Sequence, residues 1–493
     1  MSSFSRPLTE TMNRSDRVIS LLLLVAFSSL YFATTTGITC SNDGSHYALT
    51  RALAEEGRFS IASYDDYAEG NDVARREGVL YSDRPPGTAL VAAAFYKLGA
   101  LLPETLASLP SRHDAQNPRL LYVMLVPVLA GAAGLSLTYI TLRFLDVSTY
   151  GALTAAVVLG LGTVYWKYAS VLFSHALSGF LVVLTIYLTA RLARETSRAR
   201  HLSAVLGLLV GCAVLVEYSN ALLIPAIALY VWMAMQQGTA RAKAVQIGLF
   251  GLGGLLPAAF LAFYNTVNFG SPFSLSYDYA INYPWAGNLV ETFSFPIHRG
   301  LVAILYWGVG GGWCNPTCYN QGVFLLSPVL LLSLLGIGAF FRRAPRFASL
   351  TLGLFLVYVA TFAMHRTFHG FTADSRYLTP FLALWTLPLG FFVERIDSAG
   401  GRRPWRAVAT MILYGLLFLS ARNAFLHIGT SYNYSLDLGK LSTLVASPTN
   451  WAYLLREVFP NARNLPLLWL FEGIVAMVGT AVWWVGRGRL SSR

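Results

Sequence analysis

The stretch NDGSHYALTRALAEEGRFSIASYDDYAEGNDVARREGVLYSDRPPG, residues 42–87, stands apart from the rest of the chain. It is dense in carboxylates and arginines, whereas the 493-residue sequence as a whole is 55% hydrophobic and only 12% charged. It follows directly after the first long apolar segment. Because ionisable groups beside apolar segments are costly unless they serve a purpose, this stretch predicts a polar functional site at one surface of a membrane.

The overall composition is that of a membrane protein. A soluble domain carries about 25% charged residues, roughly twice the share found here. Continuous apolar runs of about 20 residues recur along the sequence, which is the length that crosses a hydrocarbon core roughly 30 Å thick. A transmembrane barrel would show alternating apolar and polar residues instead. We therefore predict an all-α polytopic membrane protein.

The apolar runs predict about twelve transmembrane helices. They cover residues 18–37, 118–141, 148–166, 170–190, 202–217, 220–235, 244–266, 321–341, 346–366, 377–394, 405–425 and 466–486. Basic residues cluster between these runs, at 191–200, 241–243, 342–346 and 395–406, and after Trp484. The positive-inside rule places these segments and both termini in the cytoplasm. The net charge of +12 therefore indicates orientation in the cell membrane and not nucleic-acid binding.

Residues 87–103 form a thirteenth apolar run that is short, contains Lys97 and begins after two prolines. If this run crossed the membrane, the basic loop 191–200 would lie outside. We therefore predict that it lies in the interface and that residues 38–117 form one external loop with two amphipathic surface helices. Residues 267–320 are expected to form a second large external loop, and residues 426–465 a short external segment. The whole chain, 1–493, is interpreted as one membrane domain.

Asp43 lies just past the predicted end of the first span, and its sequence context supports two interpretations. An Asp that opens a helix over 44–56, with Gly57 as its C-terminal stop, is good capping chemistry. A carboxylate at the water interface is also suited to act as a general base or to order a metal ion. The two interpretations are compatible. The nearby Asp65, Asp66 and Asp72 are expected to be solvated surface groups.

Three arginines are candidates for binding an anionic lipid phosphate. Arg84 precedes Pro85 and Pro86, which signal the start of a helix, and an anion at that position is stabilised by the guanidinium and by free amides. Pairing with phospholipid headgroups is the alternative for Arg84. Arg376 and Arg299 are further candidates, since planar guanidinium donors match phosphate oxygens. Alternatively, Arg376 simply pairs with Asp374.

Other polar residues near these positions are candidates for lining a substrate pocket. A lone His at the outer end of a span, such as His175, is more often packed than functional. Ionisable groups within a membrane, however, are functional more often than those in a soluble protein, so a functional role stays open. Glu217 has similar standing. The CxxxC pair of Cys314 and Cys318 is suited to a small disulfide if its loop faces an oxidising compartment. The pocket candidates are His46, Tyr47, Asp83, His175, Glu217, Tyr218, Asp374 and Tyr377.

Several common chemistries are not indicated. The sequence contains no P-loop, no GxGxxG after a strand and no HExxH. The predicted cytoplasmic loops are too short to bind ATP or a nucleotide sugar. Any activated substrate is therefore expected to arrive already attached to a lipid.

The first loop resembles that of a known family. NDGSHYALTRALAEEGRFSI, followed by YSDRPPGTALVAAAFYKLG, is similar to the opening of membrane glycosyltransferases of the GT-C superfamily, of the protein O-mannosyltransferase and aminoarabinose-transferase type. Weaker similarity covers EYSNALLIPAIALY (217–230), FYNTVNFGSPFSLSY (263–277) and DSRYLTPFLAL (374–384). The resemblance implies inverting transfer of a sugar from a polyprenyl-phosphate carrier to an acceptor hydroxyl on the external face. It implies Asp43 as the general base and Arg84 as a contact of the carrier phosphate.

The chain departs from this family at two positions. Where some relatives carry a second acidic residue at the start of the fourth span, this chain has Ser174 and His175, which argues against a two-carboxylate metal site. Where some carry a lysine for the donor phosphate, it has Glu217, which leaves Arg299 and Arg376 as phosphate partners. A divalent cation, Mg²⁺ or Mn²⁺, stays open, with Asp43 as its ligand. The acceptor is a protein, a lipid or a glycan.

Two other functions stay open. A transporter or lipid flippase would spread ionisable residues through the bilayer and show a two-fold repeat, and neither is visible in the sequence. A non-catalytic relative that binds lipid-linked glycan is the other alternative, because His175 and Glu217 depart from the family pattern.

Overall fold

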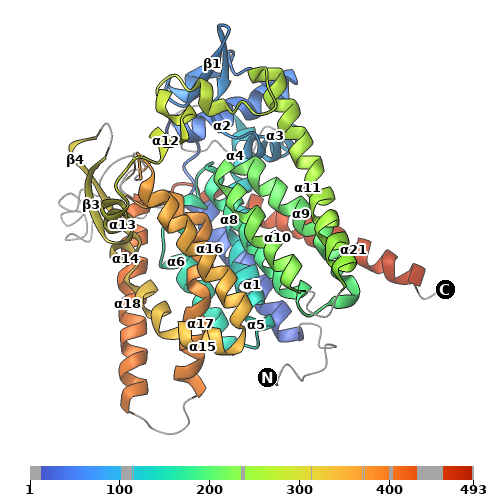
Figure 1. The fold of residues 1–493 in the computed structure, drawn as a ribbon, viewed down its shortest axis with the longest axis vertical. Helices are drawn as coiled ribbons and strands as arrows, with labels where there is room; N and C mark the ends of the chain where they lie inside the picture. Colours follow the sequence, from blue (N-terminus) through green and yellow to red (C-terminus); the bar gives the residue numbers. More distant parts are fainter. Residues whose placement is uncertain are drawn as a thin grey trace.

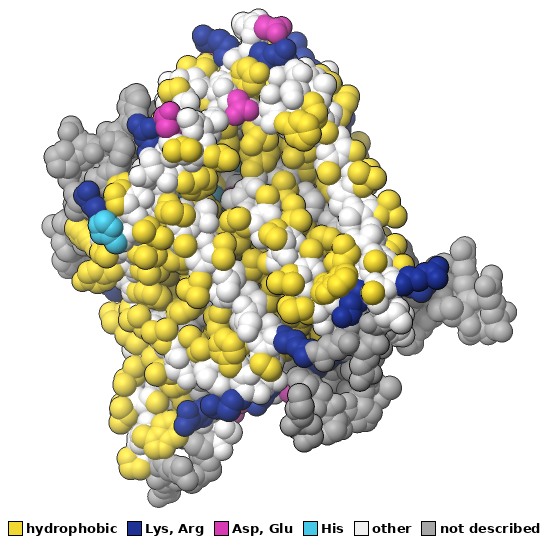
Figure 2. Space-filling view, viewed as in Figure 1, with side chains coloured by type: hydrophobic (Ala, Val, Ile, Leu, Met, Phe, Trp, Pro, Cys, Tyr) yellow, Lys and Arg dark blue, Asp and Glu magenta, His cyan; other side chains and the backbone are white. Residues whose placement is uncertain are grey.

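The computed structural model describes residues 13–101, 114, 116–234, 239–311, 314–368, 370, 372, 374–398, 404–429 and 459–490. Within these ranges the protein is a bundle of long apolar helices with a polar cap at one end (Figure 1). Figure 2 shows one face of it, on which hydrophobic side chains cover the middle and most charged side chains lie toward the two ends. This distribution is the one that a bilayer imposes on a multi-pass membrane protein.

Nine helical segments of the described residues are long and apolar enough to cross a membrane. They match nine of the twelve predicted spans. Their helices are α1 (Arg14–Ala33), α4 (Pro118–Val123) with α5 (Leu125–Phe144), α8 (Ser174–Leu192), α9 (Ala199–Val216), α11 (Ala240–Phe269), α16 (Pro345–Met364), η8 (Arg376–Phe381) with α17 (Leu382–Ser398), α18 (Pro404–Gly429), and η9 (Ala462–Asn464) with α21 (Leu465–Leu490).

The three other predicted spans are shorter or broken in the structure. Residues 148–166 form α6 (Thr149–Leu161) followed by α7 (Tyr165–Tyr168), and residues 220–235 form η4 (Tyr218–Leu222) and α10 (Leu223–Ala234). Residues 321–341 form α14 (Val323–Leu326), η7 (Pro328–Leu332) and α15 (Ser333–Arg343). Pro328 cannot donate the hydrogen bond that would continue α14, which explains the break. The total of twelve crossings therefore stays a prediction.

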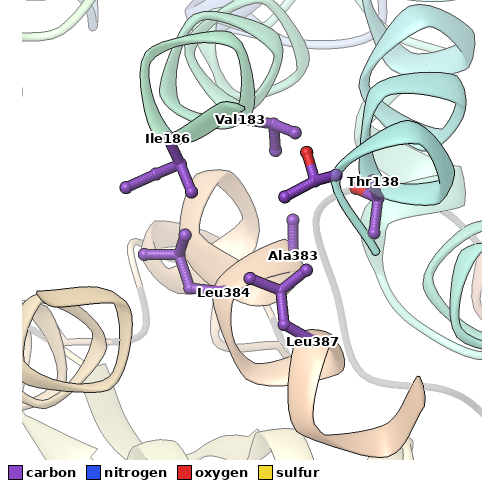
Figure 3. A pocket seen from close by; sticks show the side chains of 7 residues that line it. Thr138, Val183, Ile186, Ala383, Leu384 and Leu387 are labelled. Atoms are coloured by element: carbon purple, nitrogen blue, oxygen red, sulfur yellow. The ribbon is translucent and has the colours of Figure 1, made fainter. Parts of the chain in front are cut away.

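The core of the bundle is built on close helix contacts. Helix α5 packs against α1, α6 and α8, and α17 packs against α6 and α15. A Cβ atom added at Gly151 of α6 would lie 2.5 Å from the backbone oxygen of Gly390 in α17. Only glycine permits this approach. The gap between α5, α8 and α17 shown in Figure 3 measures about 10 Å³, no more than one water molecule needs. It is too small to hold a substrate.

The first loop folds into the cap. Helix α2 (Ser41–Arg51) continues into a π-helical turn, η1 (Ala52–Glu56), and ends at Gly57 with φ of +66°, which confirms the predicted glycine stop. A 3₁₀ turn, η2 (Asp65–Ala68), leads to an antiparallel hairpin of β1 (Val73–Arg76) and β2 (Val79–Ser82), in which Val73 faces Ser82. Helix α3 (Gly87–Gly99) follows.

Helix α3 is too short to cross a bilayer. Its 13 residues extend about 20 Å at 1.5 Å per residue, against a hydrocarbon core of roughly 30 Å. It packs against α2 and α4 and touches the end of α9, where a Cβ at Gly87 would lie 2.5 Å from the backbone oxygen of Leu215. This geometry supports the predicted surface helix, and its position relative to a membrane stays a prediction.

The second predicted external loop, 267–320, is largely ordered. It forms two 3₁₀ turns, two short helices and a hairpin: η5 (Ser276–Tyr279), η6 (Pro284–Gly287), α12 (Leu289–Thr292), α13 (Ile297–Leu305), and β3 (Trp307–Gly311) with β4 (Cys314–Gln321). The remaining turn, η3 (Thr196–Arg198), precedes α9. The side chains of Cys314 and Cys318 lie outside the described residues, as does most of segment 426–465, so the predicted disulfide stays a prediction.

Candidate functional site

Asp43 lies at the third position of α2, one turn later than a capping residue would. Its Oδ1 accepts hydrogen bonds from the backbone amides of Cys40 (2.8 Å) and Gly44 (3.0 Å). Its Oδ2 accepts from the amide and the hydroxyl of Thr39, both at 2.8 Å. The carboxylate closes a capping box in which Cys40 is the N-cap. Asp43 therefore has a capping role, but the prediction that it is itself the N-cap of a helix over 44–56 is wrong, because the helix begins at Ser41. Burial raises the pKa of Asp43 to about 6, although these hydrogen bonds act in the opposite direction.

Arg376 is near Cys40. The Cys40 thiol is close enough to both charges for them to influence it: burial and then Asp43 raise the pKa of this thiol to about 12, while Arg376 lowers it. The Arg376 guanidinium stacks over the rings of Phe173 (5.4 Å) and Tyr377 (5.2 Å) and is only 6% exposed. Within the part of the chain that the structure describes, it forms no ion pair with a carboxylate.

Asp374, the alternative partner of Arg376, is bound elsewhere. The Lys167 ammonium lies 2.9 Å from its Oδ2 and the Tyr168 hydroxyl 2.8 Å from its Oδ1. The imidazole of His427, from α18, also contacts Oδ2. Burial by itself would raise the pKa of Asp374, but the Lys167 charge and the His427 contact hold that pKa well below its usual range. Arg376 is therefore not neutralised by its neighbour in sequence.

Arg84, in contrast, is already engaged by two carboxylates. It forms an ion pair with Asp72 across the β1–β2 hairpin, and its Nε lies 3.1 Å from Oδ1 of Asp83. Asp72 is only 4% exposed, so the expectation that it is a solvated surface group is wrong: it is buried to bind Arg84 and the Ser41 hydroxyl. Burial raises the pKa of Asp83 to about 8, against the opposing charge of Arg376.

His175 and Glu217 are partners of each other. Nδ1 of His175, at the start of α8, lies 2.5 Å from Oε1 of Glu217, at the end of α9. The hydroxyl of Ser174 donates to the same oxygen at 2.6 Å. The two positions at which the chain departs from the family pattern are therefore one interacting pair. Arg376 is near enough for its charge to stabilise the ionised Glu217.

Two imidazole nitrogens face this region without a hydrogen-bond partner among the described residues. They are the buried Nε2 atoms of His46 and His175. Burial, together with the charges of Arg84 and His175, lowers the pKa of His46 to about 3. His46 is therefore neutral at physiological pH. His46 belongs to α2 in the cap, whereas His175 belongs to α8 in the bundle. The electrostatic effect of His175 on His46 therefore indicates that the cap and the bundle meet here.

The remaining pocket candidates divide into two groups. Tyr377 lies with its ring centre 6.3 Å from that of His175, and Tyr218 packs edge-on to Tyr277 at 5.5 Å. Tyr47 instead donates a hydrogen bond to Asp114 (2.7 Å). Arg299 is exposed on α13, over the ring of Phe295.

The structure therefore brings together most of the sequence-predicted residues into one cluster, hereafter the cap cluster. Its members are Asp43, His46, Asp83, Arg84, His175, Glu217, Tyr218, Arg376 and Tyr377.

Sequence reasoning missed Lys167 and His427. Lys167 follows the predicted span 148–166 by one residue and is 2% exposed. A lysine between two apolar runs is itself a signal, because charges at membrane depth are usually paired and functional. His427 lies at the end of α18, and its 53-residue separation from Asp374 hid the contact.

The geometry does not fit a metal ion at Asp43. Four N–H and O–H donors already surround its carboxylate, and donors are the wrong neighbours for a cation. Among the described residues no three His, Cys, Asp or Glu side chains are arranged to hold a metal ion.

Comparison with known proteins places the fold. No family model and no curated protein matches the sequence. The solved structure of ArnT from Cupriavidus metallidurans in the apo state is similar with a TM-score of 0.50 at 13% identity, over 92% of this chain and 76% of that chain. The same protein bound to undecaprenyl phosphate gives a TM-score of 0.49 at 13% identity, over 92% of this chain and 75% of that one.

The protein O-mannosyltransferase complex Pmt1-Pmt2 of S. cerevisiae, bound to the sugar donor, gives a TM-score of 0.40 at 11% identity, over 63% of this chain and 42% of that one. At such identities, similarity to apo ArnT establishes the fold. The chain therefore has a fold similar to that of ArnT, which agrees with the fold that the resemblance of the first loop implies.

Proposed function

We propose that the protein transfers a sugar from a polyprenyl-phosphate-linked donor to an acceptor hydroxyl on the extracytoplasmic face of the membrane, with inversion at the anomeric carbon. One observation carries the proposal: Arg376 is buried, cationic and without a carboxylate partner in the described residues. A buried guanidinium that makes no ion-pair contact is costly. An anionic ligand that enters the cap cluster would provide the missing compensation, and phosphate oxygens fit a guanidinium in two places at once.

The phosphate gains negative charge during the reaction, which suits a buried guanidinium beside it. The donor is a phosphodiester with one negative charge, and breaking its bond to C1 of the sugar leaves a phosphate monoester with up to two. Arg376 attracts the product phosphate more strongly than the donor phosphate, because the product carries more negative charge. It therefore stabilises the transition state more than the bound donor. Arg84 is a weaker candidate, because it already forms an ion pair with the carboxylate of Asp72.

Asp43 would take the proton of the acceptor hydroxyl as that oxygen attacks C1. With a pKa near 6, Asp43 is ionised at neutral pH and still a useful base. Its four hydrogen bonds leave no free lone pair, so one donor has to be released when the acceptor binds. The Thr39 hydroxyl can rotate away without disturbing the helix, whereas the three backbone amides cannot.

The test for Arg376 uses purified protein in detergent with radiolabelled polyprenyl-phosphate sugar. Arg376→Gln should lower kcat/KM for release of polyprenyl phosphate by about 10²-fold, as loss of one charge-stabilising donor does in other active sites. Arg299→Gln is the matched control, because it removes the same charge from the exposed face of α13 and should change little. Equal losses in both variants would contradict the assignment of Arg376.

The test for Asp43 separates its two roles. Asp43→Asn removes both the base and the capping box, so it should abolish transfer and loosen α2. Asp43→Glu retains the capping box, because Glu is the usual residue at this helix position. It moves the carboxylate by about 1.5 Å, which is enough to reduce a proton transfer about 10²-fold. Full turnover in Asp43→Asn, which has no carboxylate, would contradict the assignment of Asp43 as the base.

A further inference from the structure

Asp374 is a saturated carboxylate at the edge of the cap cluster. Oδ1 accepts hydrogen bonds from Tyr168 (2.8 Å) and Thr372 (2.9 Å), and Oδ2 contacts Lys167 (2.9 Å) and His427. Each oxygen therefore has two partners, which fills its lone pairs. Asp374 itself is 0% exposed. These partners come from three separate parts of the chain, namely α7, the segment before η8, and α18.

Because both oxygens of Asp374 already have two partners each, its carboxylate does not pair with Arg376. The backbone of Asp374 is fixed by a bridge to Gln321 at the end of β4. Arg376, two residues later, begins η8 and directs its guanidinium to Phe173 and Tyr377 instead of to the carboxylate beside it. An unsatisfied buried carboxylate this close in sequence would be the strongest available partner for a guanidinium.

We propose that Lys167 is a positioning residue that keeps Arg376 available for the donor phosphate. By occupying Asp374, together with His427, the Lys167 ammonium prevents an internal Asp374–Arg376 ion pair. The cation that results is held ready for a ligand in the cap cluster. This inference rests on the proposed function, because it assumes that the ligand of Arg376 is the phosphate of a polyprenyl carrier.

The test compares a single and a double variant. Lys167→Met removes the ammonium and leaves Asp374 short of a cationic partner, so Asp374 should capture Arg376. The Kd for undecaprenyl phosphate alone and the KM for the donor should each rise about tenfold, with a smaller change in kcat. In Lys167→Met/Asp374→Asn no carboxylate remains at this position to capture Arg376. Both constants should then return to within about threefold of the wild type.

Binding of undecaprenyl phosphate is measured by intrinsic tryptophan fluorescence, and folding by the thermal midpoint in the same detergent. A merely structural Lys167 would make the double variant worse than the single one, because it loses more contacts. That result, or unchanged binding in Lys167→Met, would overturn the inference. Restored binding in the double variant supports it.

A milder pair keeps the test decisive if Lys167→Met does not fold. Tyr168→Phe removes one hydroxyl donor from Oδ1 at constant shape, and Asp374→Asn in the same background is its rescue. The same direction of change is expected at smaller size, and no rescue would again contradict the inference.

Failure of the proposed function has a different signature. In that case wild-type protein would bind undecaprenyl phosphate with the same dependence on Lys167 and Asp374, yet release no carrier from any polyprenyl-phosphate sugar.

Discussion

At the scale of single residues, Asp43 shows how one carboxylate serves two purposes. Its capping role is a direct consequence of its position at the start of α2, and its burial gives it the pKa of a usable base. The hydrogen bonds provide the capping role, whereas the raised pKa comes from burial, which outweighs the opposing effect of those hydrogen bonds.

The pH dependence of turnover should report this carboxylate. A base has to be deprotonated, so kcat/KM should fall as the pH drops through about 6, the raised pKa of Asp43, and level off above it. The Thr39 hydroxyl stabilises the ionised form, so Thr39→Val should move the acid limb to higher pH. Initial rates of carrier release between pH 4.5 and about 8 measure both profiles. An acid limb that does not move in Thr39→Val would argue for a different proton acceptor.

The pair of His175 and Glu217 should respond to charge exchange. His175→Asp places two carboxylates together, and Glu217→Lys places a lysine beside the imidazole, so each single variant should lose about 3 kcal/mol or more of stability. The double variant His175→Asp/Glu217→Lys restores opposite charges and should recover much of this loss. Chemical unfolding of the wild type, both single variants and the double variant in detergent measures the four stabilities of this double-mutant cycle. Additive losses in the double variant would mean that the contact contributes little.

At the scale of helices and strands, the joint between cap and bundle depends on Gly87. A Cβ at this position would lie 2.5 Å from the backbone oxygen of Leu215 and 2.7 Å from the backbone nitrogen of Val216, and backbone cannot move aside. Gly87→Ala should therefore push α3 away from α9 at a cost of about 1–3 kcal/mol. Because Arg84 and Glu217 lie on the two sides of this joint, turnover should fall as well.

Gly251→Ala in α11 is the matched control for Gly87. Nothing lies within 4 Å of a Cβ added there, and the position is inside a helix. The change should leave turnover intact and raise stability by up to about 1 kcal/mol. A loss of stability in Gly87→Ala no larger than in this control would contradict the close contact of α3 with α9.

The sequence indicated elements better than it indicated contacts. Runs of about 20 apolar residues located nine spans, and Gly57 located the end of the first surface helix, because both signals are local. The break at Pro328 was missed, because the residues around it remain apolar. Lys167 and Asp374 are 207 residues apart, and Arg84 meets Asp72 only after the hairpin has formed. Such pairings depend on the fold and have no local signature.

At the scale of the whole molecule, orientation in the membrane is the main expectation that the fold leaves to experiment. In a background with the four native cysteines replaced by serine, Leu101→Cys should react with a membrane-impermeant thiol reagent from the outside of intact cells. Leu101 is 80% exposed just after α3. Arg198→Cys, in a basic loop, is the control and should react only after permeabilisation. Labelling of both positions from the same side would refute the predicted course of the first loop.

The hydrogen bonds between Asp43 and its own helix also affect how readily water hydrolyses the lipid-linked donor. Between acceptor encounters its carboxylate is occupied by its own helix, so a water molecule that diffuses into the cluster finds no vacant base to activate it. Only a molecule that binds well enough to displace the Thr39 hydroxyl gains access. We therefore expect idle enzyme to preserve its lipid-linked sugar, with little futile hydrolysis when acceptors are scarce.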